Sequence, residues 1–194
     1  VGDFWAIYEM IEGQKFSKEK ANEIIEEIQR LGKNGWKDSP YNDFFYMALI
    51  LNSINFHKKS EAIRYAKKFA EMRKLILKSD DYRNMAHVAY LMKAMSANEN
   101  HKECIDCFKQ VNKKWLEMEN SNYSGAIGRI YSSYARSLYS TGKKKDAVAY
   151  QEFSLAITVN LYNERKNERV EEEALFLRTI LADLGEWKSL RNLE

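Results

Sequence analysis

The chain has 194 residues, of which 45% are hydrophobic and 13% aromatic, so it can bury a core and does not have the composition of a disordered chain. The 31 basic and 28 acidic residues are mixed along the sequence and leave a net charge of +3, which gives solubility and disfavours nucleic acid as a partner. One proline and eight glycines argue against a β-sandwich, and no run of about 18 apolar residues predicts a membrane span.

Nearly every segment shows the apolar spacing of an amphipathic helix. Caps and breakers set the helix ends: Ser17, Pro40 after Ser39, and Asp81 begin helices, whereas Gly142 and Gly185 end them. The predicted helices cover approximately residues 2–13, 17–32, 41–56, 59–78, 82–98, 101–119, 123–141, 144–162, 166–184 and 187–193.

The loop "GKNGWKDSP" (32–40) is the clearest non-helical break, and most other connections are short. Short connections between long amphipathic helices predict antiparallel hairpins.

A repeat in the sequence supports this prediction of hairpins. When "EKANEI", "SEAIRY", "KECIDC" and "KDAVAY" are aligned, a small residue recurs at intervals of 41, 42 and 43 residues, and a further 43 reaches Leu190. Those small residues are Ala21, Ala62, Cys104 and Ala147.

An apolar stripe at i, i+3, i+4 and i+7 precedes each small residue, as expected for the first helix of a packed hairpin. A small residue follows because two helices must approach closely there. The stripes are Tyr46, Leu49, Ile50 and Ser53; Val88, Leu91, Met92 and Met95; and Tyr131, Tyr134, Ala135 and Leu138, with poorer matches at Trp5, Tyr8, Glu9 and Glu12 and at Ala174, Leu177, Arg178 and Leu181.

The stretch "YSTGKKKDAVAYQEF" (139–153) places three lysines after Gly142. A phosphate-binding loop would need GxxxxGK[ST] after a strand, and neither feature is present. We therefore expect Gly142 to end one helix, Lys143–Lys145 to lie on the solvated start of the next, and Ala147 to pack.

The unit that begins "YSSYARSLYSTGKKKDA" resembles the tetratricopeptide repeat family, and the resemblance extends over nearly the whole chain. It implies an all-α, right-handed superhelix of antiparallel hairpins, an α-solenoid. The family repeat is about 34 residues long, so an extended form is expected here, with HEAT-like packing, whose period is about 40–47, as the alternative. The chain is then one repeat domain with units of approximately 1–38, 39–79, 80–120, 121–163 and 164–194.

The same resemblance implies that the first helix of each unit lines a concave face that binds a protein or peptide segment. Residues one position off the buried stripes would face that surface. The candidate partner-binding residues are Phe44, Met47, Leu51, Asn55, Tyr90, Lys93, Arg129, Arg136 and Tyr139, with Ala89, Ser96 and Ser132 in the same row. Arg129, Arg136 and Lys93 could clamp an acidic group, and paired surface charges are the alternative interpretation.

No catalytic constellation, cofactor or metal is expected. The histidines His57, His87 and His101 have no metal-binding spacing, and Cys104 and Cys107 lack the second cysteine pair of a zinc site. A thiol-dependent redox or metal protein that uses these two cysteines remains an alternative, but a CxxC in mid-helix is more typical of two packed small side chains.

"YQEFSLAITVNLYNERKNERVEEE" (150–173) resembles the last repeat of helical input segments in bacterial membrane sensor kinases, although here another hairpin signal follows in place of a membrane span. Within it, Arg169 is spaced to pair with Glu172 and Glu173. The resemblance implies the input region of a bacterial signalling protein, which would be periplasmic. A cytoplasmic peptide-sensing regulator is the alternative. Because the chain begins at Val1 rather than Met, we expect an upstream segment, so no compartment is assigned.

Overall fold

The structure is a computed structural model. It describes residues 40–55, 58–117, 124–162 and 167–191 together with positions 23, 26 and 30, but not the side chains of 40–45, 75–76 and 190–191. Outside this part lie the predicted helix 2–13, most of 17–32, the loop 32–40, and the predicted caps and packing position at Ser17, Ser39 and Ala21. Contacts divide the chain into two compact units, Val1–Asn98 and Glu99–Glu194, each of which we describe by itself.

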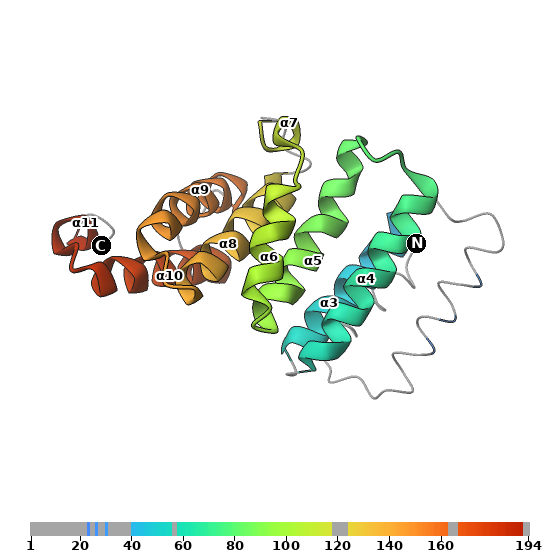
Figure 1. The fold of residues 1–194 in the computed structure, drawn as a ribbon, viewed down its shortest axis with the longest axis horizontal. Helices are drawn as coiled ribbons and strands as arrows, with labels where there is room; N and C mark the ends of the chain where they lie inside the picture. The colour runs from blue at the N-terminus through green and yellow to red at the C-terminus, as the bar shows by residue number, and fades with distance from the viewer. Residues whose placement is uncertain are drawn as a thin grey trace. The chain divides into compact units, whose positions relative to one another are not determined.

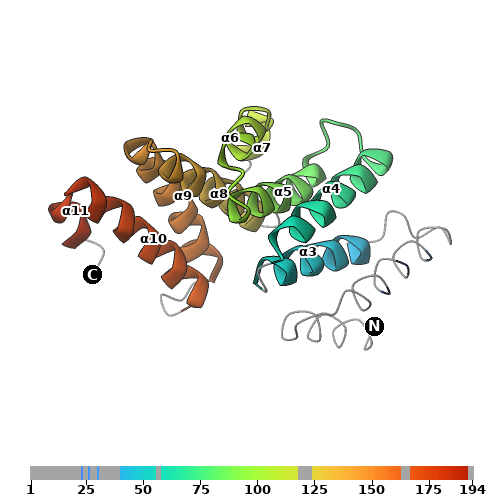
Figure 2. The ribbon, with the colours of Figure 1, turned by 60° about the horizontal axis from the view of Figure 1, so that its bottom comes forward.

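Unit 1 contains a hairpin and a third helix packed on it (Figures 1 and 2). Helix α3 (Pro40–Asn55) packs along α4 (Lys59–Ile76), and α5 (Met85–Ala97) packs against both. A 3-10 turn, η2 (Tyr82–Asn84), leads into α5, and Asp81 caps it by accepting a hydrogen bond from the Arg83 N–H at 2.9 Å. The predicted N-cap at Asp81 is thus confirmed.

Unit 2 is built on the hairpin of α8 (Ser124–Ser140) and α9 (Lys144–Tyr162). Helix α6 (His101–Lys109) packs on α8, α10 (Glu168–Leu184) packs on α9, and the short α11 (Trp187–Arg191) packs on α10. Every helix or 3-10 turn in the described residues lies close to a predicted helix, and these residues contain no strand. The all-α prediction is confirmed for this part of the chain.

The predicted helix 101–119 is interrupted, so that part of the prediction is wrong. Helix α6 ends at Lys109, and a separate turn of helix, α7 (Lys113–Leu116), follows. Asn112 causes the break because its backbone is extended and its side chain accepts a hydrogen bond from the Lys114 N–H at 3.1 Å. An asparagine that caps a new helix in this way competes with continuation of the old one.

Gly142 and Gly185 end helices α8 and α10 with positive φ angles of 83° and 71°, as predicted. Glycine adopts this left-handed conformation without steric cost. Three turns, including these two, also close with the same backbone hydrogen bond, in which an N–H donates to the carbonyl near the end of the preceding helix. These bonds join Lys58 N to Ser53 O (2.7 Å), Lys143 N to Leu138 O (2.9 Å) and Glu186 N to Leu181 O (2.9 Å).

The small residues of the repeat occupy equivalent buried positions. Ala62, Cys104 and Ala147 are each 0% exposed, and each donates its backbone N–H to the carbonyl four residues earlier, at 3.0 or 3.1 Å, in the first turn of its helix. A common backbone geometry and complete burial at three positions explain why a small side chain recurs with this period. Ala21 and the side chain of Leu190 lie outside the described part.

Each unit has its own apolar core. In unit 1 it joins α3, α4 and α5, with Leu49, Ile50, Tyr65 and Phe69 at most 1% exposed. In unit 2 the residues Ile105, Leu138, Ala147 and Ile180 form a smaller cluster from four helices. None of the helices in the described residues has the length and apolar character needed to cross a bilayer.

Candidate functional site

The candidate residues on α3 lie against the core of unit 1. Met47 and Leu51 are half-buried and pack on it, whereas Asn55 is exposed at the end of the helix. Phe44 belongs to α3, but its side chain lies outside the described part. The alternative to an accessible patch is that Phe44, Met47 and Leu51 pack against the loop around Trp36, and that loop also lies outside the described part.

The predicted exposure of Tyr90, on α5, is wrong. The sequence placed it on an accessible surface, but it is 3% exposed and belongs to the core cluster of unit 1. Ala89 is also fully buried. The reason is that α5 contacts both helices of the preceding hairpin, so its buried face is wider than one stripe. Lys93, on the same helix, remains partly exposed.

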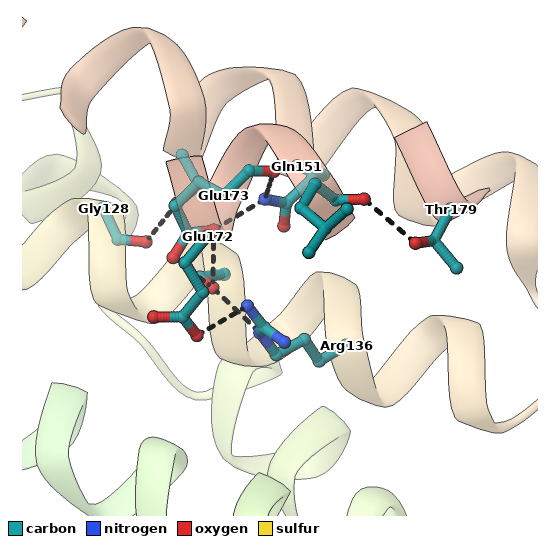
Figure 3. A network of polar contacts seen from close by, with 9 residues as sticks. Gly128, Arg136, Gln151, Glu172, Glu173 and Thr179 are labelled. Carbon is teal, nitrogen blue, oxygen red and sulfur yellow. Dashed lines mark hydrogen bonds and ion pairs between the residues drawn. The ribbon is translucent and has the colours of Figure 1, made fainter. Parts of the chain in front are cut away.

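Arg136, one of the candidates on α8, contacts side chains of α10 (Figure 3). Arg136 Nη2 donates to Glu172 Oε1 at 3.0 Å, and its guanidinium lies 4.4 Å from the centre of the Phe176 ring, a cation–π contact. Arg129, near the start of the helix, is half-buried. For Arg136 the interpretation as a surface charge paired with an adjacent helix is therefore confirmed.

Glu173 is the centre of the network drawn in Figure 3. Its carboxylate accepts hydrogen bonds from Ser132 Oγ at 2.9 and 3.0 Å and from Gln151 Nε2 at 2.6 Å. The same Gln151 nitrogen donates to the Glu173 backbone carbonyl at 2.9 Å. Gln151 is 0% exposed and Ser132 6%. Three helices thus meet at one carboxylate, which sequence reasoning did not predict because its partners are far apart in the chain.

Asp183 forms the second anchor of α10. Its Oδ2 accepts hydrogen bonds from Tyr139 OH at 2.6 Å and from Lys144 Nζ at 2.8 Å. The hydrogen bonds from Lys144 and Tyr139 lower the pKa of Asp183, and in turn the carboxylate raises the pKa of both Lys144 and Tyr139. These directions agree with an ion pair and a tyrosine that stays protonated.

The three lysines of the 139–153 stretch therefore have different environments. Lys143 and Lys145 are exposed, as predicted for a solvated turn, whereas Lys144 pairs with Asp183 and lies over the Tyr139 ring at 5.4 Å. The spacing of "GKKK" gave no signal that one lysine would differ, since the difference depends on which side of α9 meets α10.

The predicted pairs of Arg169 with Glu172 and Glu173 are wrong. Arg169 instead donates to Tyr162 OH at 2.8 Å, and its backbone N–H is capped by Asn167 at 2.9 Å. The two glutamates turn toward α8 and α9. For Glu173 the contacts with neighbouring helices are partly buried, and these outweigh an exposed pair within one helix, which contributes only a few tenths of a kcal/mol.

Five aromatic rings form a second cluster in unit 2, on α6, α8 and α9. Phe108 stacks on Tyr134 with ring centres 3.8 Å apart, and Tyr150 meets Tyr134 edge-on at 4.7 Å. The ring centre of Tyr131 lies 5.9 Å from that of Tyr150 and 5.6 Å from that of Phe153. The Phe153 side chain is 56% exposed. The rings pack mainly on one another, so they stabilise the junction of three helices.

The thiols do not have the environment of reactive cysteines. Burial raises the pKa of Cys104 to about 11 and also raises the pKa of Cys107, so both hold little thiolate at neutral pH. The Cys104 Sγ lies 3.6 Å from the carbonyl oxygen of Ser133. Within the described residues no group of three or more histidine, cysteine or acidic side chains could hold a metal ion, and His57 lies outside that part.

The candidate site is therefore a row of polar side chains on α8 and α9 that holds carboxylates presented by a helix. No protein-family model matches the chain, and no curated protein sequence matches it.

Proposed function

We propose that the chain is a non-catalytic scaffold of the tetratricopeptide-repeat type, in which stacked hairpins form a right-handed superhelix whose concave face binds a protein or peptide segment. The repeated turn hydrogen bonds and the buried small residues Ala62, Cys104 and Ala147 support the repeat architecture. The proposed array keeps the repeat period and the unit boundaries predicted from the sequence.

One observation carries the binding proposal. The row on α8 that includes Ser132, Arg136 and Tyr139 already accommodates three carboxylates from a helix, through direct hydrogen bonds of 2.6 to 3.0 Å. A surface that recognises Glu172, Glu173 and Asp183 has the chemistry to recognise acidic side chains in general. Arg129 on α8, and separately Lys93 on α5 of unit 1, are further basic candidates.

The partner class that this chemistry favours is an acidic, helix-forming peptide segment. Lys93 in unit 1 and Arg129 in unit 2 are each partly exposed and are each a candidate for such contacts, whereas Tyr90 is buried. Charge pairs at such a surface act mainly on specificity and on the association rate, so binding should weaken as salt is added.

Peptide display on the purified chain tests this proposal, followed by fluorescence anisotropy of the selected peptides. We expect acidic sequences to be enriched. Lys93→Glu or Arg129→Glu should weaken capture about tenfold, which corresponds to about 1.4 kcal/mol. Lys67→Glu, which reverses an exposed lysine on the second helix of the first hairpin, is the matched control and should bind normally.

The proposal fails if no peptide binds saturably, or if the Lys67 variant loses as much affinity as the other two. Far-UV circular dichroism of each variant separates lost binding from lost folding.

An input role in a bacterial signalling protein, periplasmic for a sensor kinase or cytoplasmic for a peptide-sensing regulator, is compatible with this scaffold. Peptide occupancy would then change contacts with another domain. The redox alternative is disfavoured by the raised pKa values of Cys104 and Cys107. Thiol titration of the folded chain checks this: rapid labelling of both cysteines at neutral pH would bring the alternative back.

A further inference from the structure

The five rings that join α6, α8 and α9 are also a surface of unit 2. Phe153 is 56% exposed, and the other four rings are each partly exposed. Accessible rings that contact one another are a frequent feature of binding sites, because aromatic side chains supply much of the energy of an interface. We call the following residues the aromatic surface: Phe108, Tyr131, Tyr134, Tyr150 and Phe153.

The three tyrosine hydroxyls of the aromatic surface make no hydrogen bond to the residues that the structure describes. Two other tyrosines of the same hairpin differ in this respect. Tyr139 OH donates to Asp183 at 2.6 Å, and Tyr162 OH accepts from Arg169 at 2.8 Å. The aromatic surface therefore keeps its polar groups available to a partner.

An exposed carboxylate, that of Asp146, lies on the aromatic side of α9. Asp146, Tyr150 and Phe153 are spaced i, i+4 and i+7, so they share one face of the helix. Burial and then Tyr150 raise the pKa of Tyr134, which Lys109 lowers and Asp146 raises further. Asp146 is thus within electrostatic range of rings on both helices of the hairpin.

A second exposed carboxylate, that of Glu117, lies near Tyr131. Burial, then Tyr150 and then Glu117 raise the pKa of Tyr131. Like Asp146, Glu117 forms no ion pair with another described residue. The nearby Lys109 is held by Asp106 at 2.7 Å, so this pair adds no net charge. The remaining exposed lysines of these elements affect the pKa of neither Tyr131 nor Tyr134: Lys113, Lys114 and Lys145.

The combination of rings, hydroxyls and carboxylates restricts the kind of partner. An apolar partner would take three hydroxyls and two carboxylates out of water without giving them hydrogen bonds, which is costly. An acidic partner would be repelled by Glu117 and Asp146. A cationic partner can use every group, because guanidinium and ammonium groups stack on aromatic rings and also pair with carboxylates.

We propose that the aromatic surface, together with Glu117 and Asp146, binds a cationic peptide segment whose arginine side chains stack on the rings and pair with the two carboxylates. This site is separate from the residues proposed above to bind an acidic segment, and it has the opposite charge preference. The chain would then hold two different peptide segments on two different surfaces.

Fluorescence anisotropy of a labelled peptide of alternating arginine and glycine, titrated with the purified chain, tests the proposal. Binding should be saturable. Lysine in place of arginine should weaken it, and glutamine or glutamate should abolish it, because the ammonium group stacks less well and the other two carry no positive charge. Phe153→Ala and Glu117→Gln should each weaken binding of the arginine peptide about threefold, as expected for one exposed contact.

Matched controls separate this site from the overall charge and apolar character of the chain. Trp187→Ala removes a ring that is 59% exposed on α11, and Glu168→Gln removes an exposed carboxylate on α10. Both variants should bind the arginine peptide as the unchanged chain does. Lys93→Glu and Arg129→Glu, which test the acidic-peptide proposal, should not weaken it either, so the two proposals fail independently.

All these substitutions are at exposed or partly exposed positions, and far-UV circular dichroism checks that each variant is folded. The proposal is overturned by a chain that does not bind the arginine peptide saturably, or by a glutamine peptide that binds equally well. Losses in Trp187→Ala or Glu168→Gln as large as those in Phe153→Ala and Glu117→Gln would overturn it too, because binding would then depend on no particular surface.

Discussion

The hairpin of α3 and α4 and the hairpin of α8 and α9 share one closing backbone hydrogen bond but have different interiors. In the first, Tyr46 stacks on Phe69 with ring centres 5.5 Å apart, and Leu49 and Ile50 are at most 1% exposed. In the second, Gly128 of α8 is so close to α9 that an added Cβ would lie 3.2 Å from Ile157 Cγ2.

Polar groups occupy much of that second interior. Ser154 Oγ donates to the Gly128 carbonyl at 3.0 Å, and Gln151 is 0% exposed. The difference shows that the turn and the small packing residue define the hairpin, while the rest of the interior is free to vary. Most of these buried polar groups have partners, because an unsatisfied group costs about 1–3 kcal/mol, but Gln151 Oε1 has none among the described residues.

The largest expected effect is on the apolar hairpin. Phe69→Ala should destabilise unit 1 by about 3–5 kcal/mol, because it removes a fully buried ring and leaves a cavity. Phe153→Ala, which removes a ring that is 56% exposed in unit 2, should cost less than about 1 kcal/mol. Urea denaturation followed by circular dichroism measures both, and equal losses would contradict the contrast between the two positions.

The second effect concerns pH and belongs to unit 1 alone. Burial, and then the charges of Arg73 and Lys74, lower the pKa of His87 from 6.5 to about 4. Its ring meets Phe69 edge-on at 6.1 Å, and its Nδ1 has no hydrogen-bond partner among the described residues. As the pH falls below 6.5, His87 becomes protonated in the unfolded chain but stays neutral in the folded chain.

Stability should therefore be intact above pH 6.5, fall by about 3 kcal/mol by pH 4, and change no further through His87 below that. Hydrogen exchange of the α4 amides, compared with those of α9, measures it. In His87→Gln this component of the pH dependence should be missing, while the titration of carboxylates remains. An identical pH profile for the two proteins would contradict the assignment.

The third effect tests the polar interior. Gln151→Ala should destabilise unit 2 by about 1–3 kcal/mol, because it deletes both hydrogen bonds to Glu173 inside a closed junction. Gln110→Ala, at an exposed glutamine after α6, is the control and should stay within about 0.5 kcal/mol. Thermal unfolding of the three proteins gives the comparison, and a neutral Gln151 variant would show that the junction is held by apolar packing alone.

The smallest effect is expected at the edge of the same network. A double-mutant cycle of Arg136→Ala and Glu172→Ala should give a coupling energy of about 0.2–1 kcal/mol that decreases with added salt, since Glu172 is largely exposed. Urea denaturation of the four proteins at low and high salt measures it. A coupling above about 2 kcal/mol, or one that salt leaves unchanged, would mean that the pair is more deeply desolvated than its exposure indicates.

Local signals in the sequence predicted the helices and several of their ends. Gly142, Gly185 and Asp81 end or begin elements where expected, because a left-handed glycine or a capping carboxylate acts within one turn of chain. Asn112 has a comparable signal that the periodicity of 101–119 concealed. The stripe Tyr46, Leu49, Ile50 and Ser53 is buried as predicted, and Ala48 and Asn52 of the same helix are buried too.

The candidate site was less predictable. The row on α8 was found from its helical register, but its occupant was not, because Glu172, Glu173 and Asp183 lie about 40 residues away and their own helix offered local partners. Tyr90 was misplaced because periodicity identifies one buried stripe and cannot show that a third helix will bury a second.

By itself the sequence determined the all-helical class of the described chain and the small residue at each close approach, since propensity, capping and periodicity act over a few residues. Only the tertiary structure decided which polar side chains would be joined to α10 and which apolar side chains, Leu175 and Trp187 among them, would stay exposed. Those outcomes depend on distances between helices that are remote in sequence, and no local pattern encodes them.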